Sequence, residues 1–367
     1  MDRFFDLVTQ PTRSAGQSAK ATVPSLADPS STLIKLNANE SVYGPSPKAV
    51  AAMRSALENS HLYPDNDSSA LRLKLAVKHG VAPEQVLISN GTTALLGVIA
   101  RTLLHPGLHA ITSACSFISY PAVTQAVGAI LVQVPLRERG FDLDAILAAI
   151  DTGTRVVFIA NPNNPTGTLL EPAAIDRFLA RVPAHVIVVL DEAYYDYAQY
   201  FAEKRGIEHS HALDYVRADR NVVVLRTFSK SHGLAGIRVG YGIGPAELMA
   251  YFAQVQDVFA VSAMAVAAAV AALDDEAHVH SALENNALQA EWMEREISAL
   301  GYAVIPTWTN FIAIEVEQDS REMARRLRRK GVLVRPLTVW GAPTSIRVTL
   351  GTPEQNQFFV RALASEK

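Results

Sequence analysis

Apolar and polar positions follow a regular rhythm along most of the chain: a short apolar run is followed by a turn and then by a helix-length segment. Several of the short runs are continuous and rich in β-branched residues, such as VIVVL at 186–190 and VVVL at 222–225. Such runs are typical of strands buried on both faces, as in parallel sheets covered by helices. The pattern predicts seven strands, at residues 86–89, 109–113, 129–134, 155–160, 185–190, 221–226 and 238–243.

The same rhythm divides the chain into three predicted parts. Residues 1–31 are rich in Ser, Ala and Pro without periodicity, and they predict an extended N-terminal arm. Residues 32–290 predict a large three-layer α/β domain, in which helices cover a mostly parallel seven-stranded sheet. After Gly301 the pattern changes to apolar runs around a charged helix at 320–330. Residues 291–367 are therefore predicted to form a small α+β domain.

Composition argues against two classes of protein. The 367 residues include 33 Lys and Arg against 36 Asp and Glu, a net charge of −3, which disfavours nucleic-acid binding by phosphate neutralisation. In the charged helix, Met323 and Leu327 lie four residues apart, so the other positions are interpreted as a solvated face. The longest apolar run, at 258–273, is alanine-rich and short for a bilayer, and it predicts a buried helix rather than a membrane span.

The cysteine and histidine content narrows the chemistry further. Cys115 is the single cysteine and cannot form an intramolecular disulfide, which favours a reducing, cytoplasmic location. We interpret it as a small buried side chain. The ten histidines lack the spacing of metal ligands, so no metal site is predicted. His232 has two open interpretations, a residue that lines a ligand pocket or a surface position at a helix start.

Polar motifs follow the predicted strands, at the ends where α/β sheets bind ligands. SNGTTALL follows the first strand and opens a helix. The free backbone N–H groups of Gly91, Thr92 and Thr93 at the helix start are suited to hold a phosphate. The alternative is that Thr92 merely caps the helix.

Three later strands also end in polar motifs. NPNNPTG follows the fourth strand; a rigid turn explains its prolines and glycine but does not require Asn164. DEAYYDY follows the fifth and places Asp191 and Tyr194 there, although a buried carboxylate is costly without a cationic partner. A lysine buried at a strand end has a lowered pKa and becomes a usable nucleophile, whereas most single lysines lie on the surface. The segment after the sixth strand contains Thr227, Ser229, Lys230 and Arg238.

Together these motifs resemble those of fold-type-I aminotransferases of class I/II, which depend on pyridoxal phosphate (PLP). The resemblance runs from LNANESVYGPSP at 36–47 to IRVTLGTPEQN at 346–356, nearly the whole chain. The combination of NPNNPTG, DEAY and SK with an arginine eight residues later is specific to this group. YPDNDSSALRLKLA at 63–76 resembles a segment of the histidinol-phosphate aminotransferase subfamily, to which the chain is most similar.

The resemblance implies a role for each motif. Lys230 is expected to bond the cofactor aldehyde and, once displaced, to move a proton. Asp191 is expected to keep the pyridine nitrogen protonated, and Asn164 and Tyr194 to hydrogen-bond the ring oxygen. Phe117, which by itself would be a core residue, is expected to stack on the ring. The phosphate is expected to bind Thr227, Ser229 and Arg238 together with the amides of Gly91, Thr92 and Thr93.

Three residues carry the implied substrate and subunit contacts. Arg347 occupies the position that binds a substrate α-carboxylate, which suits a bidentate guanidinium. Arg335 occupies the place that reaches a distal substrate phosphate, although an ordinary surface ion pair explains it equally well. Tyr63 resembles a tyrosine that reaches the cofactor phosphate of a neighbouring subunit, which implies a homodimer.

The chain also departs from the subfamily pattern. Thr93 and Ala94 replace an acidic pair, NESV replaces the more usual NENP, and Cys115 and Ser116 replace a more typical Pro-Thr. The resemblance implies that these segments lie at the pocket or its entrance, so the changes are expected to affect the substrate more than the cofactor chemistry.

The predicted function is PLP-dependent transamination between a small-molecule amino donor and a 2-oxo acid, with histidinol phosphate and 2-oxoglutarate as the first substrates to consider. An aromatic amino-acid aminotransferase is the alternative, because GVLVRP resembles those enzymes. A PLP decarboxylase or lyase on the same fold is a further alternative, since the cofactor residues are shared. A binding protein that has kept the fold is disfavoured by the full set of cofactor residues.

Overall fold

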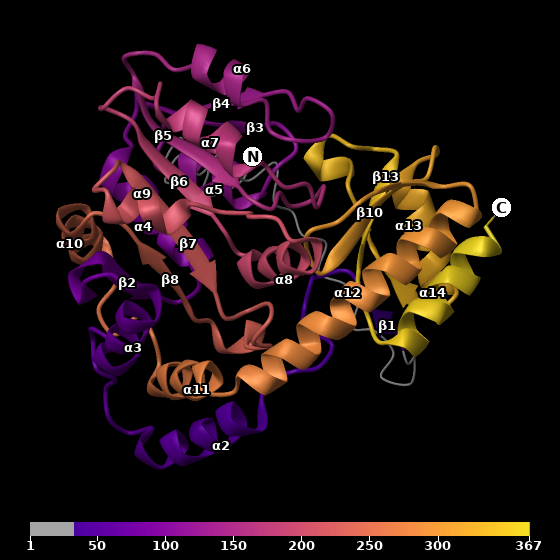
Figure 1. Cartoon of the computed structure of the whole chain (residues 1–367), viewed down its shortest axis with the longest axis horizontal. Helices are drawn as coiled ribbons and strands as arrows, with labels where there is room; N and C mark the ends of the chain where they lie inside the picture. The colour runs from indigo at the N-terminus through magenta and orange to yellow at the C-terminus, as the bar shows by residue number, and fades with distance from the viewer. Residues whose placement is uncertain (1–32, 367) are drawn as a thin grey trace, which may run out of the picture.

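The β-branched runs form the centre of a seven-stranded sheet in the computed structural model, which describes residues 33–366 (Figure 1). The predicted arm at 1–31 lies outside these described residues. One strand, β8, runs antiparallel to both of its neighbours, and the other neighbouring strands pair in parallel. The sheet order is β2 (Val86–Ser89), β8 (Gly240–Ile243), β7 (Val222–Thr227), β6 (Ile187–Asp191), β5 (Thr154–Ala160), β3 (His109–Ser113) and β4 (Ile130–Val134).

Helices pack on both faces and along the edges of this sheet (Figure 1). Local sequence explains where several of them begin and end. The side chain of Ser46 accepts a hydrogen bond from Ala49 N, and Pro47 begins the first helix. Gly80 and Gly206 end two others with positive φ. The helices are α2 (Pro47–Ala56), α3 (Ser69–His79), α4 (Thr92–Leu103), α5 (Ser119–Ala126), α6 (Leu143–Ala148), α7 (Pro172–Leu179), α8 (Tyr195–Arg205), α9 (Ala212–Arg217), α10 (Ala246–Val255) and α11 (Ala263–Leu273).

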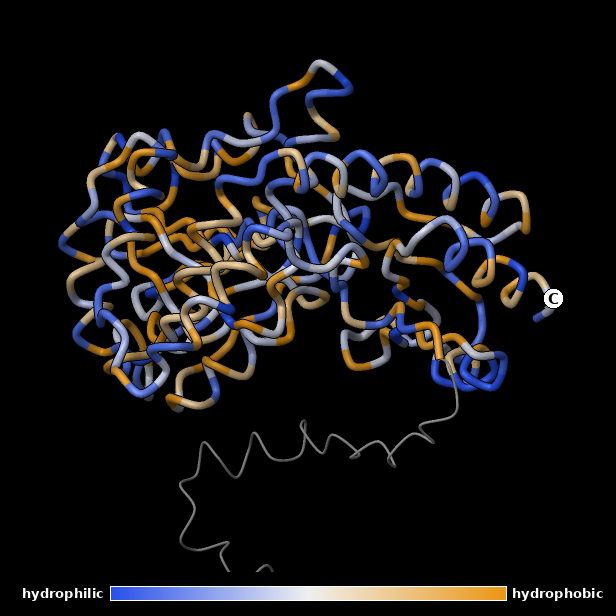
Figure 2. Tube along the Cα trace, turned by 90° about the horizontal axis from the view of Figure 1, so that it is seen from below, coloured by the Kyte–Doolittle hydropathy of each residue, from blue (hydrophilic) through white to orange (hydrophobic). Residues whose placement is uncertain are grey.

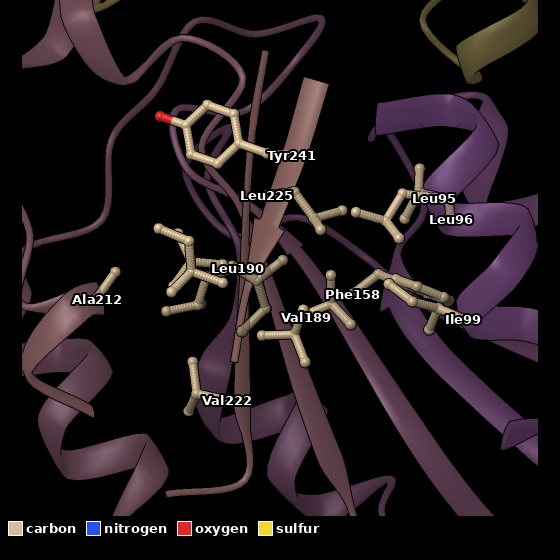
Figure 3. Packing of buried hydrophobic residues seen from close by; sticks show 14 of the residues in the cluster. Leu95, Leu96, Ile99, Phe158, Val189, Leu190, Ala212, Val222, Leu225 and Tyr241 are labelled. Carbon is tan, nitrogen blue, oxygen red and sulfur yellow. The ribbon is translucent and has the colours of Figure 1, made fainter. Parts of the chain in front are cut away.

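The largest hydrophobic core lies between this sheet and its helices. Apolar side chains of α4 meet the strand residues on one face of the sheet, as Figure 3 shows for Leu95, Ile99 and Phe158. Ala212 and Tyr241 belong to the same core. Hydrophobic segments concentrate in the interior of the molecule, whereas the outer helices alternate in hydropathy (Figure 2). Burial of the β-branched runs therefore fixes the sheet, and the strand ends are left to carry polar residues.

A second, antiparallel sheet follows in the chain and has its own hydrophobic core. The long helix α12 (Glu276–Ala299) runs from beside α11 to this part of the molecule (Figure 1). Because α12 passes continuously through residues 290 and 291, the predicted domain boundary there stays a prediction. The elements are β9 (Ala303–Ile305), β10 (Phe311–Glu315), β12 (Arg335–Pro336) and β13 (Ser345–Thr349), with α13 (Ser320–Arg329) and α14 (Pro353–Ala364) beside them.

The first described strand joins the C-terminal part. β1 (Ile34–Lys35) pairs in parallel with β11 (Val332–Leu333), although nearly three hundred residues separate them. The chain then crosses back to α2 through residues 36–46, so this crossing segment is held beside both sheets.

The apolar run at 258–273 is helical only from Ala263, so the prediction of one long buried helix is wrong for its first five residues. The side chain of Ser262 accepts a hydrogen bond from Ala265 N and starts the helix there. Before it, Val258 is 74% exposed and Phe259 has a φ of +56°. Periodicity does not reveal this start, because alanines are apolar on both sides of it.

The other predicted elements are confirmed with small shifts. The strand predicted from 238 begins at Gly240, because Arg238 adopts a left-handed conformation with φ +62°. In α13, Met323 and Leu327 are fully buried while four of the five arginines are exposed, as a solvated helix face requires; Arg326 is half-buried. Within residues 33–366, no helix is long and apolar enough to cross a membrane.

Candidate active site

A cavity of about 440 Å³ lies beyond the carboxyl ends of β5, β6 and β7. Sequence reasoning predicted fourteen site residues, and all but Gly91 and Tyr63 line this cavity. The edge of the sheet thus brings together side chains from segments that are far apart in the sequence, as doubly wound folds do. The predicted residues that line the cavity are Thr92, Thr93, Phe117, Asn164, Asp191, Tyr194, Thr227, Ser229, Lys230, Arg238, Arg335 and Arg347.

Lys230 follows β7 and extends its amine into the cavity. Its Nζ donates a hydrogen bond of 3.0 Å to the carbonyl oxygen of Asn39 and lies 5.5 Å from the centre of the Tyr194 ring. Burial, reinforced by the charge of Arg347, lowers the pKa of the amine to about 8. A substantial fraction of the amine is therefore neutral near pH 8, the form that attacks an aldehyde.

Asp191 ends β6 and is buried with few compensating partners. Tyr120 donates a hydrogen bond of 3.0 Å to its Oδ2, and the backbone N–H of Ala193 donates one of 3.2 Å to Oδ1. Burial raises the pKa of the carboxyl to about 6, although both hydrogen bonds act in the opposite direction. Among the described residues no ion-pair partner of Asp191 is found, so a cationic ligand atom would compensate this buried charge.

Tyr194 and Asn164 present polar groups to the same cavity. Tyr194 is the N-cap residue of α8, and its hydroxyl oxygen accepts a hydrogen bond of 2.9 Å from Asn39 Nδ2. Burial raises the pKa of this phenol, so it stays protonated and can donate its own hydrogen. Asn164 Oδ1 accepts a hydrogen bond from Arg347 Nη1.

The start of α4 forms a cationic cradle. Gly91, the N-cap residue, has a φ of +84°, and a Cβ at this position would lie 2.5 Å from Nη2 of Arg238. The missing side chain thus lets the guanidinium lie over the helix start, where the first N–H groups have no partner within the helix. The hydroxyls of Thr227 and Ser229 are 3.0 Å apart and line the cavity beside it. These donors suit an anion.

Two arginines of the second sheet also line the cavity. Arg335 in β12 and Arg347 in β13 are directly paired positions of the antiparallel ladder. Burial, together with a smaller contribution from the charge of Arg335, lowers the pKa of Arg347 to about 10. Neither arginine has an acidic ion-pair partner within residues 33–366, and Nε of Arg347 lacks a hydrogen-bond partner there. Like charges in paired positions are unfavourable unless something anionic lies between them.

Tyr63 lies outside the cavity of its own chain. Its side chain is 83% exposed, and its ring stacks on Phe259 with 4.6 Å between the centroids. His232 lines a second cavity, on the side of Glu192 and Arg226, and does not line the candidate site. Burial raises the pKa of Cys115 to about 11, which leaves it a poor nucleophile. In the described part of the chain, no group of three or more acidic, histidine or cysteine side chains is arranged to hold a metal.

Sequence reasoning missed three residues of the site. Asn39 contacts both Lys230 and Tyr194, Tyr120 donates to Asp191, and Trp340 lines the cavity beside the arginines. The ring of Tyr120 stacks on Phe158 in the hydrophobic core, and only its hydroxyl is polar, so the sequence pattern gives Tyr120 the character of a core residue. The motif that contains Asn39 was noted for its departure from the subfamily, but nothing local indicated that it meets β7 and α8.

Comparison with known proteins identifies the family. The model of the family "Aminotransferase class I and II" matches residues 31–363. The chain belongs to this family. It is 45% identical to histidinol-phosphate aminotransferase of Moorella thermoacetica over 332 residues, which cover 90% of this chain and 84% of the relative. It is also 45% identical to histidinol-phosphate aminotransferase 2 of Pseudomonas fluorescens (strain Pf0-1) over 336 residues, 92% of this chain and 89% of that one.

Solved structures of aminotransferases share the fold. The histidinol-phosphate aminotransferase of Sinorhizobium meliloti, in complex with pyridoxal-5'-phosphate, superposes with a TM-score of 0.84 at 27% identity, covering 100% of this chain and 97% of that one. Aspartate aminotransferase of Thermus thermophilus with maleate has a TM-score of 0.80 at 22% identity, covering 97% of this chain and 95% of that one. This class I/II aminotransferase is therefore a PLP-dependent enzyme with the α/β fold expected from its sequence.

The residues of the cavity fit that cofactor. A buried carboxylate, a cationic cradle that a Cβ at Gly91 would fill, and an amine with a lowered pKa occupy separate places around one cavity. PLP carries a pyridine nitrogen, a phosphate and an aldehyde, and each of the three protein groups matches one of these.

Proposed function

We propose that this aminotransferase moves the amino group of histidinol phosphate to 2-oxoglutarate. The observation that carries the proposal is the pair of arginines, Arg335 and Arg347, in directly opposed positions without an acidic partner in the described chain. A phosphate monoester or a dicarboxylate supplies the anion that this pair lacks. The identity of 45% to histidinol-phosphate aminotransferases over nine-tenths of the chain supports the same substrate.

The cofactor contacts follow from the donors of the cavity. We propose that Asp191 holds the pyridine nitrogen in its protonated form, and that Asn164 and Tyr194 donate hydrogen bonds to the ring oxygen. Phe117 packs against the ring face. The phosphate binds Arg238, Thr227 and Ser229 together with the backbone N–H groups of Gly91, Thr92 and Thr93.

The chemistry of transamination then divides between cofactor and chain. Bound PLP supplies an aldehyde that bonds amines and a ring that accepts electrons when a proton leaves the amino-bearing carbon. Lys230 anchors the cofactor, and its freed amine then moves the proton, a role that suits a base with a pKa of about 8. Arg347 binds the α-carboxylate of the amino acid and oxo acid, and Arg335 binds the phosphate of histidinol phosphate.

A half-reaction screen tests the proposed function. The visible absorbance of the purified holoenzyme is followed while single amino donors are added. Histidinol phosphate and glutamate are each expected to bleach it within seconds to minutes, and 2-oxoglutarate to restore it. Aromatic amino acids that bleach it while histidinol phosphate does not would point to the aromatic aminotransferase. Release of carbon dioxide or ammonia instead of a 2-oxo acid would point to a decarboxylase or lyase.

We also propose that the enzyme is a cytoplasmic homodimer whose subunits complete each other's sites. Tyr63 is 83% exposed and stacks on the ring of Phe259, itself 41% exposed, and this exposed apolar pair supports coverage by a second copy of the chain. Mixing two inactive variants, Lys230→Ala and Tyr63→Ala, tests this. Refolded mixtures are expected to regain part of the activity, because one hybrid site then has both residues. Mixtures that stay inactive contradict the shared site.

A further inference from the structure

Asn39 lies in the segment that crosses between the two sheets, and its backbone is held in an unusual conformation. Its φ is +57°, in the left-handed region, where asparagine is better tolerated than most residues. The residue is only 1% exposed. A buried polar residue in this conformation requires specific partners, and the structure provides them for both its side chain and its backbone.

The contacts of Asn39 join the two halves of the site. Its Nδ2 donates to the hydroxyl oxygen of Tyr194 at 2.9 Å, and its carbonyl oxygen accepts from Lys230 Nζ at 3.0 Å. The same carbonyl accepts from Asn310 Nδ2 at 3.1 Å. On the side of the second sheet, Asn39 N donates to Thr349 Oγ1 at 2.9 Å, and that hydroxyl donates to Asn39 Oδ1 at 3.3 Å.

The amide of Asn39 constrains the hydroxyl hydrogen of Tyr194. An N–H from Asn39 occupies a lone pair of the phenolic oxygen, so the phenol's own hydrogen must point elsewhere. Tyr194 lines the cavity, so the cavity is open to this hydroxyl hydrogen. The Asn39 hydrogen bond also opposes the rise in the pKa of Tyr194 that burial causes, which makes the phenol a stronger donor.

We infer that Asn39 is a positioning residue: its amide directs the hydroxyl hydrogen of Tyr194 into the cavity, and its carbonyl holds the amine of Lys230 in reach of the same place. The inference rests on the proposed cofactor site. It differs from a purely structural role, in which Asn39 would only fix the crossing segment to β13 through Thr349.

The side chain can be removed without forcing the backbone to move. Asn39→Gly keeps the left-handed conformation, and with it the carbonyl that holds Lys230, but removes the amide. Asn39→Asp keeps the size, yet its carboxylate accepts the hydroxyl hydrogen of Tyr194 and so withdraws it from the cavity. In both variants Tyr194 becomes a poorer hydrogen-bond donor to the ring oxygen of the proposed cofactor. The proton shared between that oxygen and the Lys230 nitrogen is then lost only at a higher pH.

The readout is the pH midpoint of the visible absorbance of the holoenzyme, measured without substrate. The midpoint is expected to rise by about 0.5 unit in Asn39→Gly and by about 1 unit in Asn39→Asp, the size of a lost hydrogen bond to a charged group. Asn286→Ala is the matched control, because it removes a buried amide that bonds Thr309 O and contacts neither Tyr194 nor Lys230. It is expected to lower the melting temperature and leave the midpoint unchanged.

The outcomes separate the inference from the proposed function. If wild-type holoenzyme lacks a visible absorbance that disappears in Lys230→Ala, the proposed cofactor site fails. If wild type has that absorbance but both Asn39 variants titrate at the wild-type midpoint, the positioning role is overturned and only the structural role remains. Should Asn39→Gly not fold, Asn39→Asp is measured both alone and combined with Tyr194→Phe, because the added carboxylate also raises the midpoint by its charge. A shift that is larger when the Tyr194 hydroxyl is present supports the inference, and an equal shift in both backgrounds refutes it.

Discussion

Asp191 and Glu192, two neighbouring carboxylates at the end of β6, are both buried but differ in how their charge is compensated. Glu192 receives hydrogen bonds from Arg226 Nε at 3.0 Å and from Nη2 at 2.7 Å, and Ser210 donates to its other oxygen. Asp191, one residue earlier, has only the hydroxyl of Tyr120 and a backbone N–H. The two side chains line different cavities. We call Glu192 with Arg226 the closed pair, because its charges compensate each other, and Asp191 an open charge, because no ion-pair partner for it is found in the described chain.

The difference identifies the cavity that needs a ligand. Contact with Glu192 raises the pKa of Arg226 despite its burial, and its guanidinium lies 3.3 Å from the centre of the Tyr195 ring. The cavity beside this pair is the larger, at about 540 Å³, yet its buried charges already compensate each other. In the smaller cavity Asp191 and Lys230 form no ion pair within the described chain, so the carboxylate and the amine can both bind a ligand. Charge compensation, and not volume, distinguishes the proposed active site from the larger cavity.

The largest effect on activity is expected from removing Lys230, a cation of the smaller cavity. Lys230→Ala should reduce turnover at least about 10³-fold, because Lys230 is the proposed cofactor anchor and proton-transfer group. Lys78→Ala is the matched control, since Lys78 lines the closed cavity. It should change turnover less than about twofold, as exposed surface charges usually do. Steady-state kinetics of both variants measure this, and equal losses of turnover in the two variants would contradict the distinction between the two cavities.

Breaking the closed pair should cost folding stability. Glu192→Gln leaves the guanidinium of Arg226 buried without its counter-charge, and it is expected to lower the free energy of unfolding by about 3 to 5 kcal/mol. Chemical denaturation of the cofactor-free protein measures this without interference from cofactor binding. An unchanged midpoint would mean that the pair contributes no more than a surface salt bridge.

Removing the open anion should have the opposite effect on stability. The pKa of Asp191 is raised from 3.8 to about 6, so its contribution to stability is full below pH 3.8 and is lost as pH rises through 6. At pH 8, Asp191→Asn removes this cost and should stabilise the cofactor-free protein by about 2 to 3 kcal/mol, with no gain near pH 4. Its transamination rate should nevertheless fall, because Asp191 is the anion proposed to hold the ring nitrogen of the cofactor in its protonated form.

Denaturation of wild type and Asp191→Asn at pH 4, 6 and 8 checks the sign of this effect. A gain in stability that grows with pH supports the open-charge description. Destabilisation at pH 8 would show that Asp191 is already compensated in the cofactor-free protein, and the contrast with Glu192 would disappear.

The sequence predicts those residues of the site that follow recognisable strands, because the local apolar pattern and the order of the strands place them at one edge of the sheet. Lys230 and Asp191 each follow a continuous β-branched run, and the carboxyl ends of parallel strands meet at one edge. The antiparallel direction of β8 was not predicted, because a buried apolar run has the same pattern in either direction. Asn39 was missed because its partners Tyr194 and Thr349 are 155 and 310 residues away, and no local signal encodes such pairing.

The smallest effect is expected at the substrate end, where the open charges are a pair of cations. Arg335→Ala should lower kcat/KM for histidinol phosphate by about 10- to 30-fold, the size of one charge-assisted contact, and for an aromatic amino acid by less than about threefold. Arg335→Lys keeps the charge but not the bidentate geometry, and it should lie between the two. Because Arg347 loses a like charge opposite it, the cofactor-free Arg335→Ala protein should be at least as stable as wild type. Equal losses for both substrates, together with lower stability, would place Arg335 in an ordinary structural contact and leave the phosphate to another residue.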